Sequence, residues 1–273
     1  MEAEKRFKLR YDMSIELPGV TLYRIEALQD LDIHGVKKGD LGGYIEKESN
    51  LDGDAWVFDY AKVFGDAVVY DNAVVSDNAT VSGYALVFGH AKVTGSSTVS
   101  DRARVFGYSM VYGSSRVNGN ARVYGQSRLY DIAQVSGNSQ LFGDASVYDN
   151  ACVGGDAHVC GNSRVFGSAT VCDRSLVFGE AEVSDKGYVL GRSVVGGDEI
   201  KSLSDLRNIA GGDYNITILP RLIQIGCQRH TKEEWWRFTD KEILDMDGRD
   251  GLKWWKKWKP ILMAICAEAE KGE

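Results

Sequence analysis

A six-residue repeat constrains this chain more than any other feature of its sequence. From Ala55 to Asp198 the sequence reads Ala/Ser-x-Val-x-Gly/Asp-x for twenty-four consecutive hexads, without an insertion. Alternation of a small residue and Val predicts a short strand with one apolar face, and the following Gly or Asp tolerates the left-handed angles of a turn. Such a unit buries its apolar side only by stacking on its neighbours, so the repeat predicts a parallel β-helix.

Aromatic residues at the position after Val indicate how many hexads make one coil. Taken every third hexad, this position holds six aromatics in one column, five in a second and one in the third. The first column reads Tyr70, Phe88, Phe106, Tyr124, Phe142, Cys160, Phe178 and Gly196. The repeat therefore has an eighteen-residue super-period, which predicts a triangular prism of eight coils with three hexads in each.

Two segments of different character flank the repeats of residues 55–198. Residues 1–54 contain one expected strand, Val20 to Ala27, and should cover the first coil, because an exposed sheet end invites self-pairing. Residues 199–273 should form a small α+β module that contains a strand and Trp-rich helices.

The C-terminal segment begins with a strand-like stretch, ITILPRLIQIG, and continues with two helical patterns. Thr231 and Glu234 make a capping box for the first helix, which should run to about Met246. The second helix should begin near Leu252 and kink at Pro260.

Composition argues against several classes of protein. The net charge of −7 divides as −4 over residues 1–54, −3 over the repeats and zero over the rest, so we expect no direct DNA binding. The five cysteines are odd in number and not spaced as a disulfide framework, which favours a reducing cytoplasm. No apolar stretch is long enough for a membrane span, and the charged start has no signal-peptide core.

The run GDLGGYIEKESNL leading into DAWVFDYAKVFGDA resembles hexapeptide-repeat proteins of phages, prophages and gut bacteria. Many of these carry a C-terminal module with a Gly-Cys pair, a nearby His and a helix-borne Trp, which Gly226, Cys227, His230 and Trp235 match here. The resemblance implies a left-handed β-helix and an origin in a mobile element. It implies little about activity, because such proteins are labelled only as hexapeptide-repeat proteins or transferases.

Enzymes on this scaffold need features that the repeats lack. Hexapeptide acyltransferases use a histidine general base and a loop excursion, whereas these hexads contain no excursion and only His90 and His158. A zinc-dependent carbonic anhydrase would need three converging histidines. We therefore expect a non-enzymatic protein with no catalytic residue, no cofactor and no metal, and keep an acyltransferase-like enzyme as the alternative.

Cys227 and His230 are spaced as half of a zinc site, but no second pair of suitable spacing accompanies them. The expected arrangement is a buried thiol beside a surface histidine.

The aromatic column with six members marks one face as the first candidate binding surface. Arg104, Phe106, Arg122 and Tyr124 should lie together there in successive coils, continued by Phe142. Arginine beside an aromatic ring can stack on a flat group while it pairs with phosphate or carboxylate. Other arginines should raise the local positive potential: Arg102, Arg116 and Arg128. The aromatic rings either lie on this face or fold over the adjacent turn.

The Trp-rich C-terminal segment is the second candidate, through Trp235, Trp236 and Trp254. Trp255, Trp258 and Leu262 should face inward and cover the last coil, with the neighbouring lysines in solvent and Trp254 left exposed as an interface anchor. Lying on a membrane is the less favoured reading of this segment.

These observations favour a cytoplasmic binding or scaffold protein that uses a rigid β-helix to hold or sequester a host macromolecule or a small anionic ligand. With the phage resemblance, a counter-defence role is its most concrete version. We also expect a homo-oligomer, most simply a two-fold dimer. A structural, polymer-forming protein is a third possibility.

Overall fold

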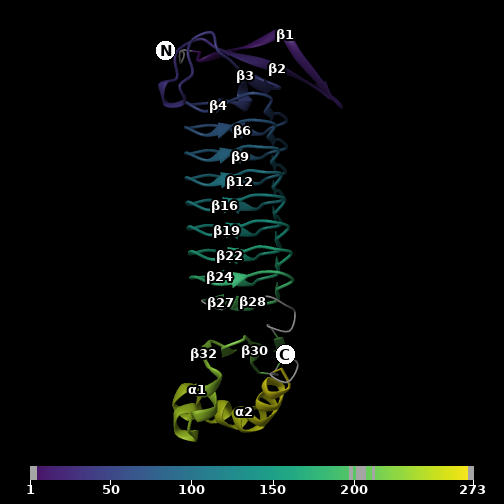
Figure 1. The fold of residues 1–273 in the computed structure, drawn as a ribbon. Helices are drawn as coiled ribbons and strands as arrows, with labels where there is room; N and C mark the ends of the chain where they lie inside the picture. The colour runs from purple at the N-terminus through teal and green to yellow at the C-terminus, as the bar shows by residue number, and fades with distance from the viewer. Residues whose placement is uncertain (1–4, 197–198, 201–206, 211–212, 270–273) are drawn as a thin grey trace.

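The computed structural model describes residues 5–196, 199–200, 207–210 and 213–269, and its main body is a long stack of parallel coils (Figure 1). Each coil contributes one short strand to each of three sheets, so the predicted β-helix with three hexads per coil is confirmed. Gly197 and Asp198, the end of the last repeat, lie outside the described residues.

The three sheets form the three faces of the solenoid. The first face consists of β4 (Trp56–Val57), β7 (Val74–Val75), β10 (Lys92–Val93), β13 (Met110–Val111), β16 (Arg128–Leu129), β19 (Ser146–Val147), β22 (Arg164–Val165), β25 (Glu182–Val183) and β28 (Glu199–Ile200). The second face contains β5 (Lys62–Val63), β8 (Thr80–Val81), β11 (Thr98–Val99), β14 (Arg116–Val117), β17 (Gln134–Val135), β20 (Cys152–Val153), β23 (Thr170–Val171) and β26 (Tyr188–Val189). The third face contains β6 (Val68–Val69), β9 (Leu86–Val87), β12 (Arg104–Val105), β15 (Arg122–Val123), β18 (Gln140–Leu141), β21 (His158–Val159), β24 (Leu176–Phe178) and β27 (Val194–Gly196).

Successive coils pair in strict register, eighteen residues apart, as Arg104 with Arg122 and Val105 with Val123. The Val side chains of the hexads point inward and are fully buried, as expected for the period-two pattern. Where Ser replaces Ala it is also fully buried, and its hydroxyl donates to a backbone carbonyl three residues earlier, as Ser97 does to Thr94 at 2.7 Å. Ser therefore fits the interior without leaving a polar group unpaired.

The N-terminal segment continues the second face beyond the repeats. β1 (Phe7–Leu17) and β2 (Val20–Ala27) form an antiparallel hairpin, and β2 pairs with β3 (Leu41–Ile45), which in turn pairs in parallel with β5. The strand predicted from Val20 to Ala27 is confirmed. β1 was not predicted, although its alternation from Phe7 to Leu17 is regular.

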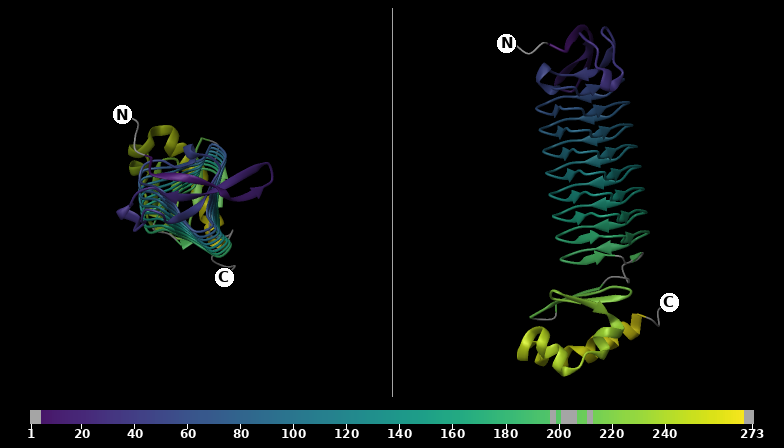
Figure 2. Two further views of the ribbon diagram at one scale, coloured as in Figure 1. Left: turned by 90° about the horizontal axis from the view of Figure 1, so that it is seen from above. Right: turned by 90° about the vertical axis from the view of Figure 1, so that its left-hand side faces the viewer.

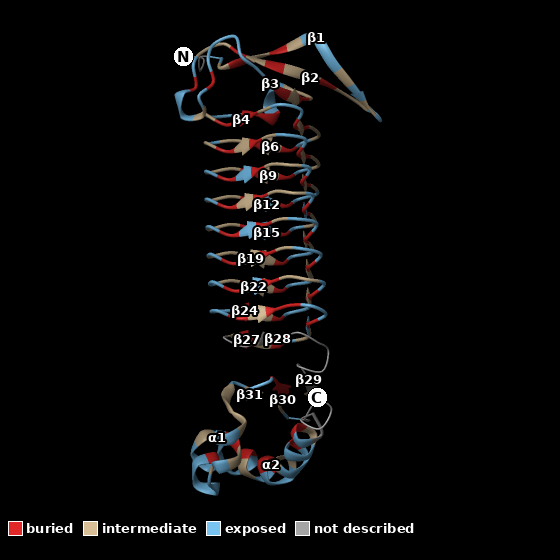
Figure 3. Ribbon diagram, in the orientation of Figure 1, coloured by how far each residue is buried: buried red, intermediate tan, exposed pale blue. Residues whose placement is uncertain are grey.

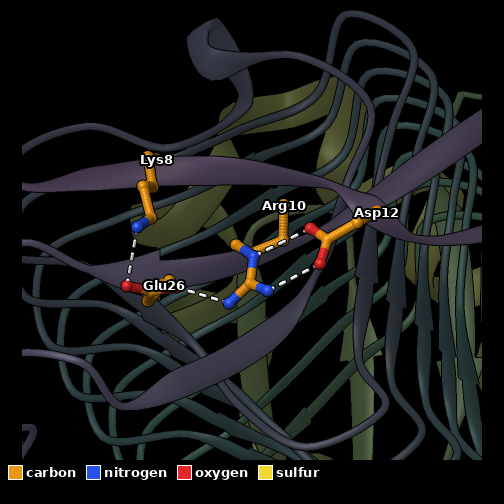
Figure 4. A network of polar contacts seen from close by, with 4 residues as sticks. All are labelled: Lys8, Arg10, Asp12 and Glu26. Atoms are coloured by element: carbon orange, nitrogen blue, oxygen red, sulfur yellow. Dashed lines mark hydrogen bonds and ion pairs between the residues drawn. The ribbon is translucent and has the colours of Figure 1, made fainter.

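The distal half of the β1–β2 hairpin projects beyond the outline of the coils when they are viewed along their axis (Figure 2). Colouring by burial shows the β1 side of this arm largely exposed and its β2 side mostly half-buried, in contrast to the buried interior of the coils (Figure 3). A charge network at the base of the arm joins its strands: Arg10 binds Glu26 at 2.7 Å and Asp12 at 2.6 Å, and Lys8 binds Glu26 at 2.8 Å (Figure 4). These bonds lower the pKa of both carboxylates and span the bulge that follows Arg10 in β1.

The C-terminal module contains an antiparallel sheet of β29 (Arg207–Ala210), β30 (Asn215–Ile218), β31 (Leu222–Ile225) and β32 (Gln228–Thr231). The stretch ITILPRLIQIG thus forms a hairpin, β30–β31, and the expectation of one strand was wrong, because its Pro and Arg make a turn. Leu219 in that turn is buried in the same cluster as the coil interior, and Arg229 donates to the carbonyl oxygen of Gly196 at 2.9 Å. The sheet therefore covers the last coil.

Two helices pack on the other side of this sheet. α1 (Lys232–Arg237) begins at the predicted Thr231–Glu234 capping box, but it ends well before Met246, because Thr239 and Glu242 form a second cap at the start of α2 (Asp240–Ala269). α2 departs from helical backbone angles at Asp247 and Gly248, within the predicted break. The break expected after Met246 is thus confirmed, whereas α2 keeps helical backbone angles at Pro260, where a kink was expected. No helix among the described residues is long and apolar enough to cross a membrane.

Candidate ligand-binding groove

The structure brings the predicted arginine and aromatic residues of the third face together. Arg104 and Arg122 are exposed neighbours in β12 and β15, and within the described part of the chain neither guanidinium group has an ion-pair or hydrogen-bond partner. Phe106, Tyr124 and Phe142 stack with ring centroids 4.8 to 5.0 Å apart and ring planes within 3° of parallel. The eighteen-residue period was the signal that placed them in one column.

The rings lie on the face rather than over the turn. The hydroxyl of Tyr124 donates to Gln140 in β18, the next strand of this face, at 3.0 Å. Phe142 lies edge-on to His158, which has the equivalent position one coil further along, with ring centroids 6.5 Å apart. Each ring is half-buried by its neighbours in the stack, and burial raises the pKa of Tyr124. The column therefore covers much of its own apolar surface, and less is left for a partner than the sequence indicated.

The other three arginines do not belong to this patch. Arg116 lies in β14 on the second face and Arg128 in β16 on the first. Arg102 lies at a corner, with its guanidinium 5.8 Å from the ring of Tyr84. Residues that are six or twelve positions apart in the sequence lie on different faces of the solenoid. The expectation that these three arginines add to the positive potential around Arg104 and Arg122 was therefore wrong.

The tryptophans form a separate core between the C-terminal sheet and its helices. Trp235 and Trp254 are buried, with 3% and 8% of their surface exposed, and Trp236 is half-buried. Trp255 and Leu262 face inward as predicted, but they pack on the sheet and not on the last coil, which the sheet itself covers. The expectation of an exposed Trp254 was wrong, because the indole packs edge-on against Tyr214 at 4.7 Å.

The Cys-x-x-His pair also differs from its expected arrangement. Cys227 is exposed, whereas His230 is half-buried, with its ring edge-on to Trp235 and Phe238 at 5.1 and 4.8 Å. Among the described residues, no disulfide joins any of the five cysteines. Within the described residues, no three His, Cys, Asp or Glu side chains converge in an arrangement that could hold a metal ion.

A groove lies on the first face of the solenoid, near its N-terminal end, and it was not predicted from the sequence. The aromatic column of this face begins at Phe58 and resumes at Tyr112, with the small residues Ser76 and Thr94 between them. Both small side chains line this groove, which has a volume of about 650 Å³. The remaining lining residues are Ile33, His34, Phe58, Asn72, Val74, His90, Lys92 and Tyr108.

A loop of the N-terminal segment forms one wall of this groove. The short helix η1 (Asp32–His34) ends at Gly35 in a left-handed conformation, with a φ of 69° that glycine adopts without strain. It places the ring of His34 edge-on to Phe58, with centroids 6.4 Å apart. The Nε2 atom of His34 is buried and has no hydrogen-bond partner among the described residues.

The opposite wall is a corner between the third and first faces. His90 occupies this corner and stacks on Tyr108 of the next coil, with centroids 4.7 Å apart and planes 5° from parallel. Lys92 extends from β10 into the groove between Val74 and Met110 of the neighbouring strands.

The groove brings together three basic groups, His34, His90 and Lys92. Burial lowers the pKa of His34, and the nearby charges of Lys92 and His90 lower it further. None of the residues that line the groove is a carboxylate. A negatively charged ligand would relieve this repulsion, and Ser76, Thr94 and Asn72 offer hydrogen-bonding groups beside it.

Comparison with known proteins supplies no identity for the site. No protein-family model matches the chain, and no curated protein is significantly similar to it.

Proposed function

We propose that this chain is a non-enzymatic binding protein whose rigid β-helix holds an anionic ligand in the groove beneath η1. The observation that carries the proposal is the convergence of His34, His90 and Lys92 in a hollow lined by no carboxylate. The ligand class is a phosphate, sulfate or carboxylate attached to a flat ring, because Phe58 and the His90–Tyr108 stack supply aromatic surface beside the cationic groups.

The geometry of the histidines supports binding rather than acid–base catalysis. A catalytic imidazole is commonly oriented by a hydrogen bond from its second nitrogen to a carboxylate or carbonyl. In the groove His90 stacks on Tyr108, and the buried Nε2 of His34 has no hydrogen-bond partner in the described part of the chain. The resemblance to phage and prophage proteins supports an extension of the proposal, in which sequestration of such a ligand counters a host response in the cytoplasm.

An NMR titration of the histidine ring signals tests the proposal inside one molecule, because the chain has four histidines and only two line the groove. Phenyl phosphate should shift the signals of His34 and His90 and leave those of His158 and His230 unchanged. Inorganic phosphate should bind more weakly, and phenol should not saturate. Equal shifts at all four histidines, or none, would refute the groove as the site.

Variants provide the matched comparison. Lys92→Ala should weaken phenyl phosphate binding about tenfold, the loss of one charge-assisted contact, whereas Lys62→Ala on the second face should have no effect. His90→Ala and His158→Ala form a second pair with the same expected contrast. Turnover of an acyl thioester that depends on His90 would favour the enzyme alternative, and concentration-dependent filaments would favour the structural one.

A further inference from the structure

A second hollow lies at the opposite end of the molecule, inside the C-terminal module. It is a cleft between the four-stranded sheet and α2, with a cavity volume of about 80 Å³. Its lining residues are Tyr214, Ile225, Cys227, Gln228, Trp235, Ile243, Met246, Asp247, Gly251, Trp254 and Trp255. Four of these residues are aromatic: Tyr214, Trp235, Trp254 and Trp255.

The aromatic rings present faces in several directions. Tyr214 and Trp254 meet at an angle of 68°, with centroids 4.7 Å apart, and Trp235 and Trp255 meet at 40° and 5.1 Å. Trp235 is fixed in this position because its indole N–H donates to the carbonyl oxygen of Ile223 at 2.6 Å. The walls of the cleft are thus non-parallel ring surfaces held by the fold.

One negative charge lies at the mouth of the cleft. Asp247 is the only charged residue in the lining, and it is exposed. The departure of α2 from helical angles at Asp247 and Gly248 sets the direction of this carboxylate, and the hydroxyl of Tyr214 donates to it. No lysine or arginine is among the lining residues to neutralise it.

We propose that this cleft binds an organic ammonium cation, such as a methylated amine head group. The negative faces of aromatic rings attract a cation, and quaternary ammonium groups are recognised by cages of several rings. The cavity suits a head group of a few heavy atoms, and the carboxylate of Asp247 supplies the counter-charge. An uncharged apolar group would fill the same space but would gain nothing from Asp247. This site is independent of the anion groove, which is built from the other end of the chain.

Comparing choline with its neutral carbon isostere, 3,3-dimethyl-1-butanol, shows whether the cleft selects an ammonium cation or any apolar group of the same shape. Calorimetry and tryptophan fluorescence of the full chain should show saturable binding of choline. The isostere should bind about tenfold more weakly, which corresponds to about 1.4 kcal/mol. Equal affinity for the two compounds would overturn the proposal in favour of a merely apolar cleft, and saturation by neither would remove the site.

Variants at the mouth test the role of the charge. Asp247→Asn should weaken choline binding at least about fivefold while the melting temperature stays unchanged, as expected for an exposed side chain. Asp245→Asn, at an exposed position of α2 outside the lining, is the control and should bind choline normally. Unchanged choline affinity in Asp247→Asn would overturn the assignment of the counter-charge. Phenyl phosphate binding in the groove should be the same in both variants, so the proposal for each site is tested independently of the other.

Discussion

The carboxylate of Asp149 accepts a hydrogen bond of 3.0 Å from the backbone N–H of Gly167, the residue one coil further along the helix. Asp149 itself has a φ of 56°, in the left-handed region, and its own N–H donates to Asp131 at 3.2 Å. The same bond from one coil to the next occurs at other turns, at Asp71, Asp77, Asp101 and Asp173. Asp at the fifth position of a hexad therefore both tolerates the turn and links two coils, whereas Gly does only the first.

Substitutions at Asp149 should separate these two contributions. Asp149→Gly loses the bond to Gly167 but keeps the turn, whereas Asp149→Ala loses the bond and also carries the strain of left-handed angles, a further cost of about 1 kcal/mol. Asp149→Asn should keep the turn and most of the hydrogen bond to Gly167. Thermal melting should rank the variants Asp, Asn, Gly and Ala in falling order, and an Ala variant as stable as the Gly variant would contradict this account.

The second prediction concerns the buried interior of the coils. Val105 and Val123 are fully buried in adjacent coils, so Val105→Asp would place an unpaired charge in a dry core and should cost several kcal/mol. Loss of soluble protein or a sharply lower melting temperature is the expected result. Arg104→Asp, one residue away on the exposed side of the same strand, is the control and should melt within a few degrees of the parent.

The inward-facing positions such as Val105 could be predicted from the sequence alone, because a period of two and a super-period of eighteen determine which face each hexad residue occupies. The position of His34 could not be predicted, because no local pattern determines where the η1 loop packs. This loop lines the groove together with Ser76 and Thr94, which follow it in the sequence by about forty and sixty residues. The interrupted aromatic column was the available signal for the groove. Similarly, Trp254 was assigned to the surface because the sequence does not show that a sheet separates its helix from the last coil.

Lowering the pH should destabilise the folded protein and strengthen anion binding in the groove. Because the pKa of His34 is lowered from 6.5 in the folded protein, the unfolded chain takes up a proton first, and the empty protein should lose stability as the pH falls below about 6.5. A bound anion favours protonated His34, so affinity should rise over the same interval. Calorimetry with inorganic sulfate, whose charge is constant there, measures the second effect. His34→Gln should flatten both profiles, and a pH-independent sulfate affinity in the parent protein would contradict the role of His34.

The exposed arm leads to a prediction about assembly. β1 is the terminal strand of its sheet, so one of its edges is unpaired, and Tyr11 in it is 69% exposed. We predict a homo-oligomer, most simply a two-fold dimer formed through this arm. Light scattering over a wide concentration range should give a dimer mass, and Tyr11→Glu should shift it toward monomer, with Tyr84→Glu at an exposed corner as the control. A monomer mass at every concentration would remove the prediction.

The last prediction concerns the unpaired arginines of the third face. Arg104→Glu with Arg122→Glu leaves the interior untouched and retains the like-charge spacing between β12 and β15, so the variant should fold normally. If these guanidinium groups beside the stacked rings hold an acidic partner, binding of a labelled acidic peptide should fall about tenfold or more. Arg116→Glu with Arg128→Glu makes the same change in net charge on the other two faces and should reduce peptide binding far less. Equal losses in the two double variants would mean that only net charge matters. Full binding in both would leave the third face without a partner and make the C-terminal module around Trp236 the next surface to test.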